Sequence, residues 1–426
     1  MGKNGRLNKS DGRLTHENSS KNGTHHNNNS SSSSRKAGPK TKSVRQKLNL
    51  VTTASASNRD SSARELLELQ QTILNIFEAA FASSLAANNF LEILQEIKDA
   101  LFERDFNRAF GTSQYLETYA ARWSSSRALC YYSLLIDLQT NFMTIDDDGI
   151  ILPKSGLEEH SLSLLKKSKA ESLSLLQDFN KVVCFGGGAA EVVAFAGFLR
   201  HLKNNVCHQK IRHSQDKIDP LTTESDPSML DTKYSICLID CAQWQDVIHK
   251  LNDALTSFPM ASVDNETTKI ETSSLFLNPS DINVSYVQED ILTMSPKQLI
   301  NLFNQKQTFV TILFTLNELY NSSVSKTTAF LLNLTLALKS GSILLVVDSP
   351  GSYSETSIGS CKKKYPINWL LDYILLNEST KISKDSRANW IKLISEESKW
   401  FRIPDSLKYA IPIENMRYQI HLYQRL

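Results

Sequence analysis

The stretch KVVCFGGGAAEVVAFAGFLRHL, residues 181–202, decides how the rest of the chain is interpreted. A short apolar run, residues 182–185, leads directly into Gly186, Gly187 and Gly188, and a helical pattern follows at once. Glycine permits positive φ angles and close approach of a ligand, and the first turn of a helix presents unpaired N–H groups. The stretch therefore predicts a strand–turn–helix that binds an anionic or nucleotide-like ligand, against the alternative of a tight turn that binds nothing.

The spacing of the glycines narrows the class of cofactor. A dinucleotide-binding turn has the pattern G-x-G-x-x-G, but Glu191 stands where the third glycine would be. A phosphate-binding P-loop is excluded because no G-K-[ST] triplet follows Gly188. The sequence therefore disfavours a nicotinamide-dependent oxidoreductase and favours the looser glycine turn of methyltransferases that use S-adenosyl-methionine.

Strand and helix patterns alternate along the chain from this turn onward. Short apolar runs separated by helical periodicity are typical of parallel strands that are covered on both faces. The five runs are residues 182–185, 234–239, 284–287, 309–314 and 343–347. Residues 409–413 and 418–423 flank a polar tetrapeptide and predict an antiparallel strand pair near the C-terminal end. We therefore expect an α/β fold with a mostly parallel sheet.

The regions around this sheet differ in composition. Residues 1–62 carry a net charge of +9 and few apolar side chains, whereas the remainder carries −7, so we expect a disordered basic tail. The tail either attracts polyanions or serves as a solubilising or targeting extension. Residues 63–150 show helical stripes, and residues 151–426 form the predicted methyltransferase domain. Two polar insertions, at about residues 204–233 and 264–280, are expected to be surface loops.

Carboxylates follow the second and third predicted strands, at the sheet edge where open α/β sheets bind ligands. Asp240 ends the second strand, where it could accept hydrogen bonds from both ribose hydroxyls of a nucleoside. Asp290 follows the third strand and could accept the exocyclic amine of adenine, with Ile291 packed on the ring. The alternatives are a turn-forming Asp240 and an Asp290 that caps the following helix.

Polar side chains also follow the fourth and fifth predicted strands. Asn317 and Glu318 follow the fourth strand, and Asp348 and Ser349 end the fifth. Since these ends share an edge with the glycine turn, the four side chains are candidates for substrate contact. The alternative for each is the capping of a loop.

Other function classes lack their signals in this chain. The six cysteines include no C-x-x-C pair, so we expect no metal site, and no G-x-S-x-G elbow of a hydrolase occurs. No run of 18 apolar residues predicts a membrane span, and the polar N-terminal segment has no secretory signal. We therefore expect a protein of the cytosol or nucleus that is not secreted.

Five stretches together resemble one enzyme family, the fungal 25S ribosomal RNA uridine-N(3) methyltransferases. The stretches are ARWSSSRALCYY (121–132), VVCFGGGAAEVVAF (182–195), LLVVDSPGSYSE (344–355), KKYPINWLLDYILL (363–376) and IENMRYQIHLYQR (413–425). The resemblance covers roughly residues 115–426 in the same order.

The resemblance implies a class I methyltransferase fold, that is, a Rossmann-like, mostly parallel seven-stranded sheet with an antiparallel C-terminal strand. It also implies S-adenosyl-methionine as donor, one uridine of large-subunit rRNA as acceptor, and action in the nucleus or nucleolus and the cytoplasm. Two positions depart from the general class I pattern: Cys184 replaces an acidic residue, and Ala190 replaces a glycine. The backbone of the glycine turn and Asp240 are therefore the cofactor contacts that transfer best.

The resemblance also suggests roles in catalysis and RNA binding. Glu318 or Asp348 would act as the base that removes the uridine imide proton. Arg122 and Arg127 would hold the RNA backbone, although Arg127 is equally suited to a structural ion pair. Two other functions stay open: a methyltransferase with another RNA or a protein as acceptor, and a non-catalytic ribosome-assembly factor with a methyltransferase-like fold.

Overall fold

The computed structural model describes residues 62–141, 144–145, 151–152, 179–215, 233–259, 275–351, 355–357, 364–376 and 389–426. These residues belong to one compact unit, which extends from residue 60 to residue 426. The predicted basic tail lies outside the described residues except for its last residue, and so do large parts of both predicted insertions.

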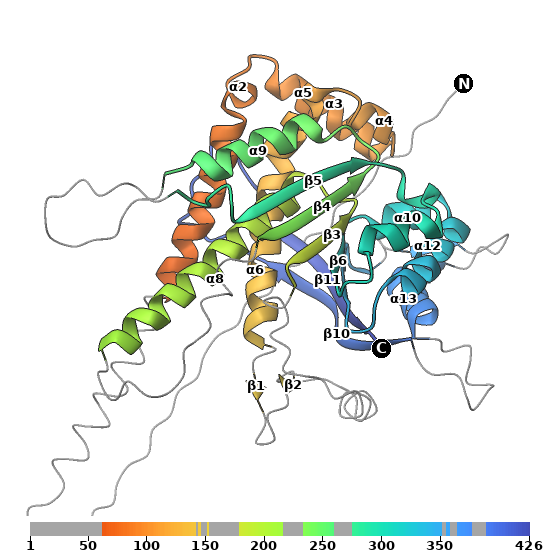
Figure 1. Ribbon diagram of the computed structural model, residues 1–426. Helices are drawn as coiled ribbons and strands as arrows, with labels where there is room; N and C mark the ends of the chain where they lie inside the picture. The colour runs from red at the N-terminus through yellow and green to blue at the C-terminus, as the bar shows by residue number, and fades with distance from the viewer. Residues whose placement is uncertain are drawn as a thin grey trace, which may run out of the picture. The chain divides into compact units, whose positions relative to one another are not determined.

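A seven-stranded sheet forms the centre of this unit, in the order β10-β11-β7-β6-β3-β4-β5 (Figure 1). Its strands are β3 (Lys181–Phe185), β4 (Tyr234–Asp240), β5 (Ile282–Gln288), β6 (Phe309–Leu313), β7 (Ile343–Asp348), β10 (Trp390–Phe401) and β11 (Met416–Arg425). The first five are parallel, and β11 pairs antiparallel with both β7 and β10. This topology confirms the predicted class I methyltransferase fold.

The central strands are buried on both faces, which explains their unbroken apolar sequences. Every residue of β6 and β7 is buried. In β3, Val182 and Cys184 face one hydrophobic core, whereas Val183 and Phe185 face the other. Alternate residues of a strand point to opposite faces, so one apolar run supplies both cores.

Helices cover the two faces of the sheet. The first core contains residues of the helix 62–80, α3 (Phe90–Phe102), α6 (Ser125–Asn141), α8 (Ala189–Gln215) and α9 (Gln245–Ser257). The second contains residues of α10 (Pro296–Phe303), α11 (Leu316–Ser322), α12 (Val324–Ala337) and α13 (Ile367–Leu375). Shorter elements are α2 (Ala82–Leu85), α4 (Phe106–Ala109), α5 (Ser113–Tyr119), β1 (Thr144–Ile145), β2 (Ile151–Leu152), β8 (Glu355–Ser357) and β9 (Lys364–Pro366).

The helical character expected N-terminal to the sheet is present. A π-helical segment, η1 (Ala120–Ser124), joins α5 to α6, and such segments are frequent at functional sites. The short strand β1 lies within residues 63–150, which were expected to be helical, and it pairs with β2 just beyond them. The division into domains near residue 150 stays a prediction.

Two sequence expectations are wrong in detail. Helix α8 continues to Gln215, so residues 204–215 are helical rather than loop; they contain neither glycine nor proline to end the helix. The partner of the C-terminal strand is β10, not residues 409–413, which form no strand. Pro412 has no N–H to donate to a ladder, whereas Trp390, Ile391 and Leu393 of β10 bury apolar side chains.

Candidate cofactor and substrate site

Backbone hydrogen bonds hold the segments after successive strands together at the carboxyl edge of the sheet. The N–H of Gly186 donates to the carbonyl of Ile239, with 2.8 Å between N and O. The N–H of Phe314 donates in the same way to Val347, with 2.7 Å between N and O. The structure therefore places the glycine turn, the end of β4, and the segments after β6 and β7 side by side, as the sequence predicted.

The glycine turn is constrained by neighbouring side chains as well as by its own dihedral angles. Gly186 has a φ of 69°, and a Cβ atom there would collide with the side chain of Thr315. A Cβ atom on Gly188 would lie 3.3 Å from the ring of Trp244. Gly186 is needed for the packing of the protein itself and Gly188 is tightly packed, so the glycines alone do not prove ligand binding.

Glu191 occupies part of the helix N-terminus that the sequence assigned to a ligand. Its Oε2 accepts the N–H of Gly188 at 2.8 Å, and the side chain is buried. Burial raises the pKa of this carboxyl to about 7, while the hydrogen bond from Gly188 and the charge of Arg127 oppose that rise. The N–H of Gly188 is therefore already satisfied within the protein.

The carboxylate of Asp240 closes the turn after β4. Its Oδ1 accepts the N–H of Ala242 at 2.8 Å, and the hydroxyl of Tyr286 donates to its backbone carbonyl at 3.1 Å. Burial raises the pKa of Asp240 to about 6, against opposing hydrogen bonds from Ala242 and Trp244. Asp240 is half-buried and pairs with no cation among the described residues, so its carboxylate is suited to meet a polar or cationic ligand.

Asp290 caps a helix, which is one of the two roles that the sequence left open. Its Oδ1 accepts the N–H of Leu292 at 2.9 Å and so begins the 3-10 helix η3 (Ile291–Thr293). Asp290 is exposed, whereas the Ile291 side chain is buried in the second core. The contact of both residues with adenine stays a prediction.

Asp348 joins the segments that follow β6 and β7. Its Oδ2 accepts the N–H of Asn317 at 2.9 Å, and its Oδ1 accepts the N–H of Ser349 at 2.7 Å. Burial raises the pKa of Asp348 to about 6, although both hydrogen bonds oppose the rise. Asp348 therefore fixes the backbone of Asn317 and Ser349, two of the predicted substrate contacts.

Glu318 is less enclosed than Asp348. Its Oε1 accepts from the side-chain amide of Asn317 at 3.4 Å, and its Oε2 lies 3.5 Å from the guanidinium of Arg104. About a third of the Glu318 side chain is exposed, at 35%. Burial raises its pKa and Arg104 lowers it.

The two predicted RNA-binding arginines lie in different surroundings. Arg122 is only 7% exposed and pairs with Glu414 in the segment before β11. The guanidinium of Arg127 lies 5.4 Å from the ring centre of Tyr119 and 5.6 Å from that of Phe314. The charge of Arg127 favours the ionised forms of Glu191 and Asp348, and its guanidinium donates to the hydroxyl of Tyr119; both roles that the sequence left open for Arg127 stay predictions.

An aromatic cluster that the sequence did not predict lies beside the glycine turn. The ring of Tyr119 lies 5.0 Å from that of Phe110, 5.1 Å from Trp123 and 5.9 Å from Trp244, between ring centres. Phe110, Tyr119 and Trp123 come from the N-terminal helices, more than 60 residues before the turn. No local pattern places them there, because their contact with Trp244 is purely tertiary.

Phe314 is a second feature that the sequence did not reveal. It has a φ of 54°, a conformation that costs a non-glycine residue roughly 1–2 kcal/mol. Its ring packs against that of Tyr131, with 6.3 Å between their centres, and under Arg127. Backbone strain of this kind clusters at functional sites, where the surrounding structure enforces it.

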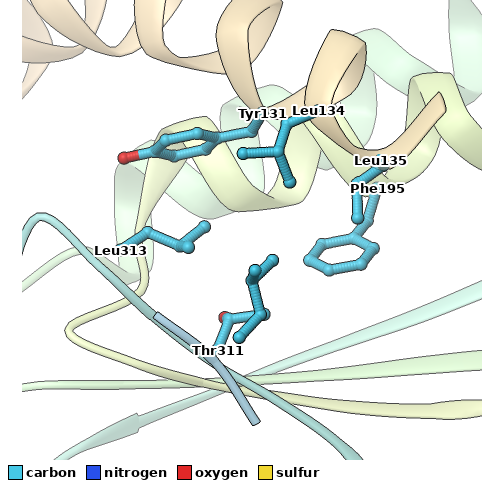
Figure 2. A pocket seen from close by; sticks show the side chains of 7 residues that line it. Tyr131, Leu134, Leu135, Phe195, Thr311 and Leu313 are labelled. Atoms are coloured by element: carbon cyan, nitrogen blue, oxygen red, sulfur yellow. The ribbon is translucent and has the colours of Figure 1, made fainter. Parts of the chain in front are cut away.

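A small apolar cavity lies elsewhere, between the sheet and helices α6 and α8 (Figure 2). It is lined by Tyr131, Leu134, Leu135, Phe195, Thr311, Leu313 and Leu345. The lining contains no carboxylate or cation, so the cavity is part of the core packing and not the candidate site.

The comparisons with known proteins agree with this geometry. A family model described as "Putative SAM-dependent methyltransferase" matches residues 77–424, which is most of the chain. The chain belongs to this family. Among curated proteins, it is 28% identical over 361 residues to the 25S rRNA (uridine(2843)-N(3))-methyltransferase of Saccharomyces cerevisiae, covering 83% of this chain and 85% of the relative.

Solved methyltransferase structures are more distant. A SAM-dependent methyltransferase from Methanosarcina mazei is 11% identical, with 59% of this chain and 94% of that chain covered and a TM-score of 0.28. A methyltransferase from Thermoplasma acidophilum is also 11% identical, with 65% and 78% covered and a TM-score of 0.28. The fold assignment rests on the strand order and not on these scores.

The charges at the site fit S-adenosyl-methionine, the methyl donor of this family. Glu191, Asp240 and Asp348 are desolvated carboxylates with raised pKa values, and Arg127 is the cation that faces two of them. S-adenosyl-methionine carries a sulfonium and an ammonium group, which would supply the missing positive charge and favour the ionised carboxylates. Among the described residues, no group of three or more His, Cys, Asp and Glu could hold a metal ion.

No helix in the described part of the chain is long and apolar enough to cross a membrane.

Proposed function

We propose that this protein transfers a methyl group from S-adenosyl-methionine to N3 of a uridine in large-subunit (25S) ribosomal RNA. The observation that carries the proposal is the 28% identity to the yeast enzyme of that activity, which extends over 83% of this chain. The carboxylate-rich carboxyl edge of the sheet supports it, because that edge would hold the donor next to the acceptor. Pre-ribosomal RNA in the nucleolus, nucleus or cytoplasm would then be the partner.

For the cofactor, we assign the turn of Gly186, Gly187 and Gly188 to the methionine end and Asp240 to the ribose hydroxyls. Because the N–H groups of Gly186 and Gly188 already donate to Ile239 and Glu191, the carbonyl oxygens of the turn are the contacts we assign to the ammonium group of the methionine. Asp290 and Ile291 remain the candidates for the adenine. The methyl donor, when bound, supplies an electrophilic carbon, and the protein contributes the alignment of that carbon with the acceptor nitrogen. Holding the reacting atoms ~3–3.5 Å apart accounts for much of the acceleration in such a reaction.

The acceptor nitrogen must lose a proton, and Glu318 is better placed to take it than Asp348. Both carboxylate oxygens of Asp348 accept backbone hydrogen bonds, whereas Glu318 keeps part of its surface open to solvent. Burial also raises the pKa of Glu318, and a higher pKa makes its carboxylate a stronger base. We therefore assign Glu318 as the base and Asp348 as the residue that positions Asn317 and Ser349 against the uracil.

The alternatives differ in acceptor or in turnover. A methyltransferase of another RNA or of a protein would keep the donor site and leave rRNA uridines unchanged. A non-catalytic assembly factor would bind RNA without transferring a methyl group. The desolvated carboxylates favour an intact donor site over the second alternative, because buried charges without a ligand destabilise the fold.

The test is to delete the gene and map N3-methyluridine in large-subunit rRNA. A methyl group on N3 blocks the pairing edge of the base, so reverse transcription stops there in the parent and reads through in the deletion strain. Re-expression of the chain should restore the stop, and re-expression of Glu318→Gln should not. Unchanged rRNA methylation in the deletion strain would refute the proposed acceptor, and calorimetry with S-adenosyl-methionine and NAD separates the two cofactor classes.

A further inference from the structure

The β10–β11 hairpin carries exposed cationic and aromatic side chains beyond the end of β7. Gln419 of β11 pairs with Asp348, the last residue of β7, so the residues of β11 before Gln419 extend past the carboxyl edge. Arg417, in that extension, is exposed and pairs with Trp400 of β10. Trp400 is 53% exposed, and the guanidinium of Arg402 stacks over its ring at 4.4 Å from the ring centre.

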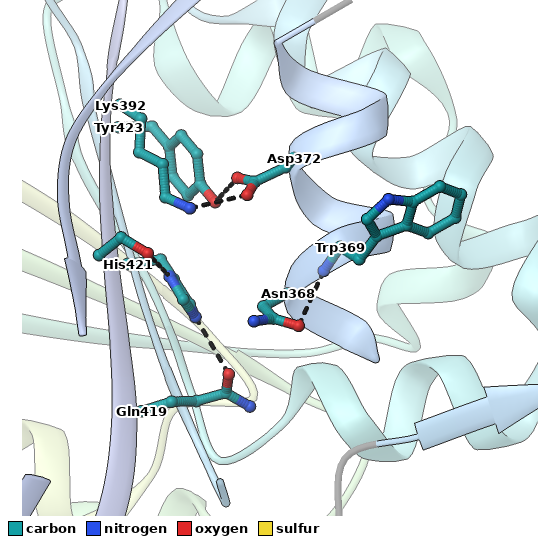
Figure 3. Close-up of polar contacts among 8 residues, drawn as sticks. Asn368, Trp369, Asp372, Lys392, Gln419, His421 and Tyr423 are labelled. Atoms are coloured by element: carbon teal, nitrogen blue, oxygen red, sulfur yellow. Dashed lines mark hydrogen bonds and ion pairs between the residues drawn. The ribbon is translucent and has the colours of Figure 1, made fainter. Parts of the chain in front are cut away.

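These three residues form one surface, which we name the arginine–tryptophan patch. Arg417, Gln419 and Tyr423 lie on the same face of β11, because alternate residues of a strand share a face. Trp400 shares that face as the cross-strand partner of Arg417. Helix α13 covers the other end of this face, where the hydroxyl of Tyr423 donates to Asp372 at 2.7 Å (Figure 3).

The arginines of the patch are available to bind anions. Neither Arg402 nor Arg417 forms an ion pair with any described residue, although the Nε of Arg417 donates to Ser398 at 2.9 Å. Glu396 pairs with Ile420, which faces the first core, so its carboxylate lies on the opposite face from Trp400. The two charged side chains that the contacts place on the patch, Arg402 and Arg417, are both cations.

The patch is close to the candidate site. The side-chain amide of Gln419 donates to the carbonyl of Ser349 at 2.8 Å, which ties the hairpin to the segment predicted to contact substrate. Trp400 lies two strands across and two residues along from Asp348, a Cα separation of about 12 Å for regular strand spacings. A ligand in the candidate site that extends as a polymer would reach it.

We propose that the arginine–tryptophan patch binds the RNA strand next to the acceptor uridine, with an unpaired base stacked on Trp400 and phosphates held by Arg402 and Arg417. An exposed ring beside guanidinium groups that form no ion pair with a described residue is the chemistry that recognises single-stranded nucleic acid without base specificity. The inference rests on the proposed function, since it takes the acceptor to be RNA. It also moves the predicted RNA contact from Arg122, which is buried, to the hairpin.

The test measures binding of a short, fluorescein-labelled oligouridylate by anisotropy to the full chain and its variants. Trp400→Ala should weaken binding about 5- to 150-fold, the range for loss of one stacked base. Trp400→Phe keeps a ring and should restore most of it. The matched control is Trp369→Ala on α13, because Trp369 is also exposed, at 44%, but its side chain points away from β11 (Figure 3).

A salt titration isolates the arginines. For single strands, each cation that meets a phosphate contributes about 0.7 to the slope of log K against log salt concentration. The double variant Arg402→Ala/Arg417→Ala should therefore lower the magnitude of the slope by about 1.4. If Trp400→Ala is unstable, the affinity of Trp400→Phe and the salt slope of the double arginine variant still test whether the patch binds RNA.

The outcomes separate the inference from the proposed function. If Trp400→Ala binds RNA as well as Trp369→Ala does, and the salt slope is unchanged, the patch does not bind RNA and the inference is wrong. That result would leave rRNA methylation by the wild-type chain intact. If the patch binds RNA but deletion of the gene leaves rRNA methylation unchanged, the proposed function fails and the patch assignment stands.

Discussion

The two ends of the sheet's carboxyl edge have opposite character. Just after β3 and at the end of β4, Glu191 is a buried carboxylate and Asp240 a half-buried one, and desolvation raises the pKa of both. At β10 and β11, Arg402 and Arg417 are exposed cations beside an exposed tryptophan. A small cationic donor suits the first environment and a polyanion suits the second, so the comparison suggests how one edge serves two different ligands.

The largest expected effect is on catalysis, at α11, the helix that follows β6 between these two regions. Glu318→Gln should lower the rate of methyl transfer about 10²- to 10⁴-fold, the usual contribution of a general base, without changing donor affinity. Single-turnover methylation of an RNA substrate and calorimetry with S-adenosyl-methionine measure the two quantities. Arg104→Ala is the companion variant, because removal of this cation should raise the pKa of Glu318 and shift the rate profile to higher pH. A Glu318→Gln variant of full activity would exclude Glu318 as the base.

A substitution in the glycine turn tests how much the packing of that turn contributes to the stability of the protein. Gly186→Ala should cost about 2–5 kcal/mol of unfolding free energy, from the positive φ and the collision with Thr315 together. Gly351→Ala is the matched control, since its φ of 67° is similar but no atom lies within 4 Å of the added Cβ. Urea denaturation should show a loss of only about 1–2 kcal/mol for the control. Equal losses would mean that packing against Thr315 contributes nothing.

The raised pKa of Glu191 makes stability depend on pH. Its folded pKa of about 7 lies above the ordinary value of 4.5, so the folded state holds a proton that the unfolded state has released between these values. The stability that Glu191 contributes is therefore full below about pH 4.5 and is lost as the pH rises to 7, by roughly 3 kcal/mol. Glu191→Gln should flatten this part of the stability profile in denaturant titrations. A profile identical to that of the wild type would show that Glu191 is not the group responsible.

The smallest expected effect separates two carboxylates of the donor site. Asp240→Ala should weaken S-adenosyl-methionine binding about 10-fold, because a hydrogen bond to a charged group contributes roughly 1.5 kcal/mol. Asp290→Ala should cost about 0.5–2 kcal/mol of stability through loss of the helix cap. Calorimetry on both variants decides whether Asp290 also binds adenine: unchanged affinity would leave it as a cap alone. Unchanged affinity of Asp240→Ala for S-adenosyl-methionine would contradict the assignment of Asp240 to the ribose hydroxyls.

Local sequence determined the parallel core of this protein. The five apolar runs form β3 to β7 because a strand that is buried on both faces needs a continuous apolar sequence. Such a run can be recognised in the sequence without knowing which strand pairs with it. The glycine turn and the carboxylates Asp240 and Asp348 follow in the same way from their positions at strand ends. The order of the five stretches that resemble the rRNA methyltransferases also lies in the sequence alone.

Only the tertiary structure decided which groups meet. The sequence could not show that Glu191 caps the N–H of Gly188, that Arg122 is buried against Glu414, or that Tyr119 lies beside Trp244. Nor could it choose β10 over residues 409–413 as the partner of β11. Periodicity reports burial along one element, whereas pairing and charge neutralisation depend on contacts between residues far apart in the chain. The sequence therefore predicted which residues lie at the carboxyl edge of the sheet. It did not predict that this edge has a desolvated acidic region and an exposed basic region.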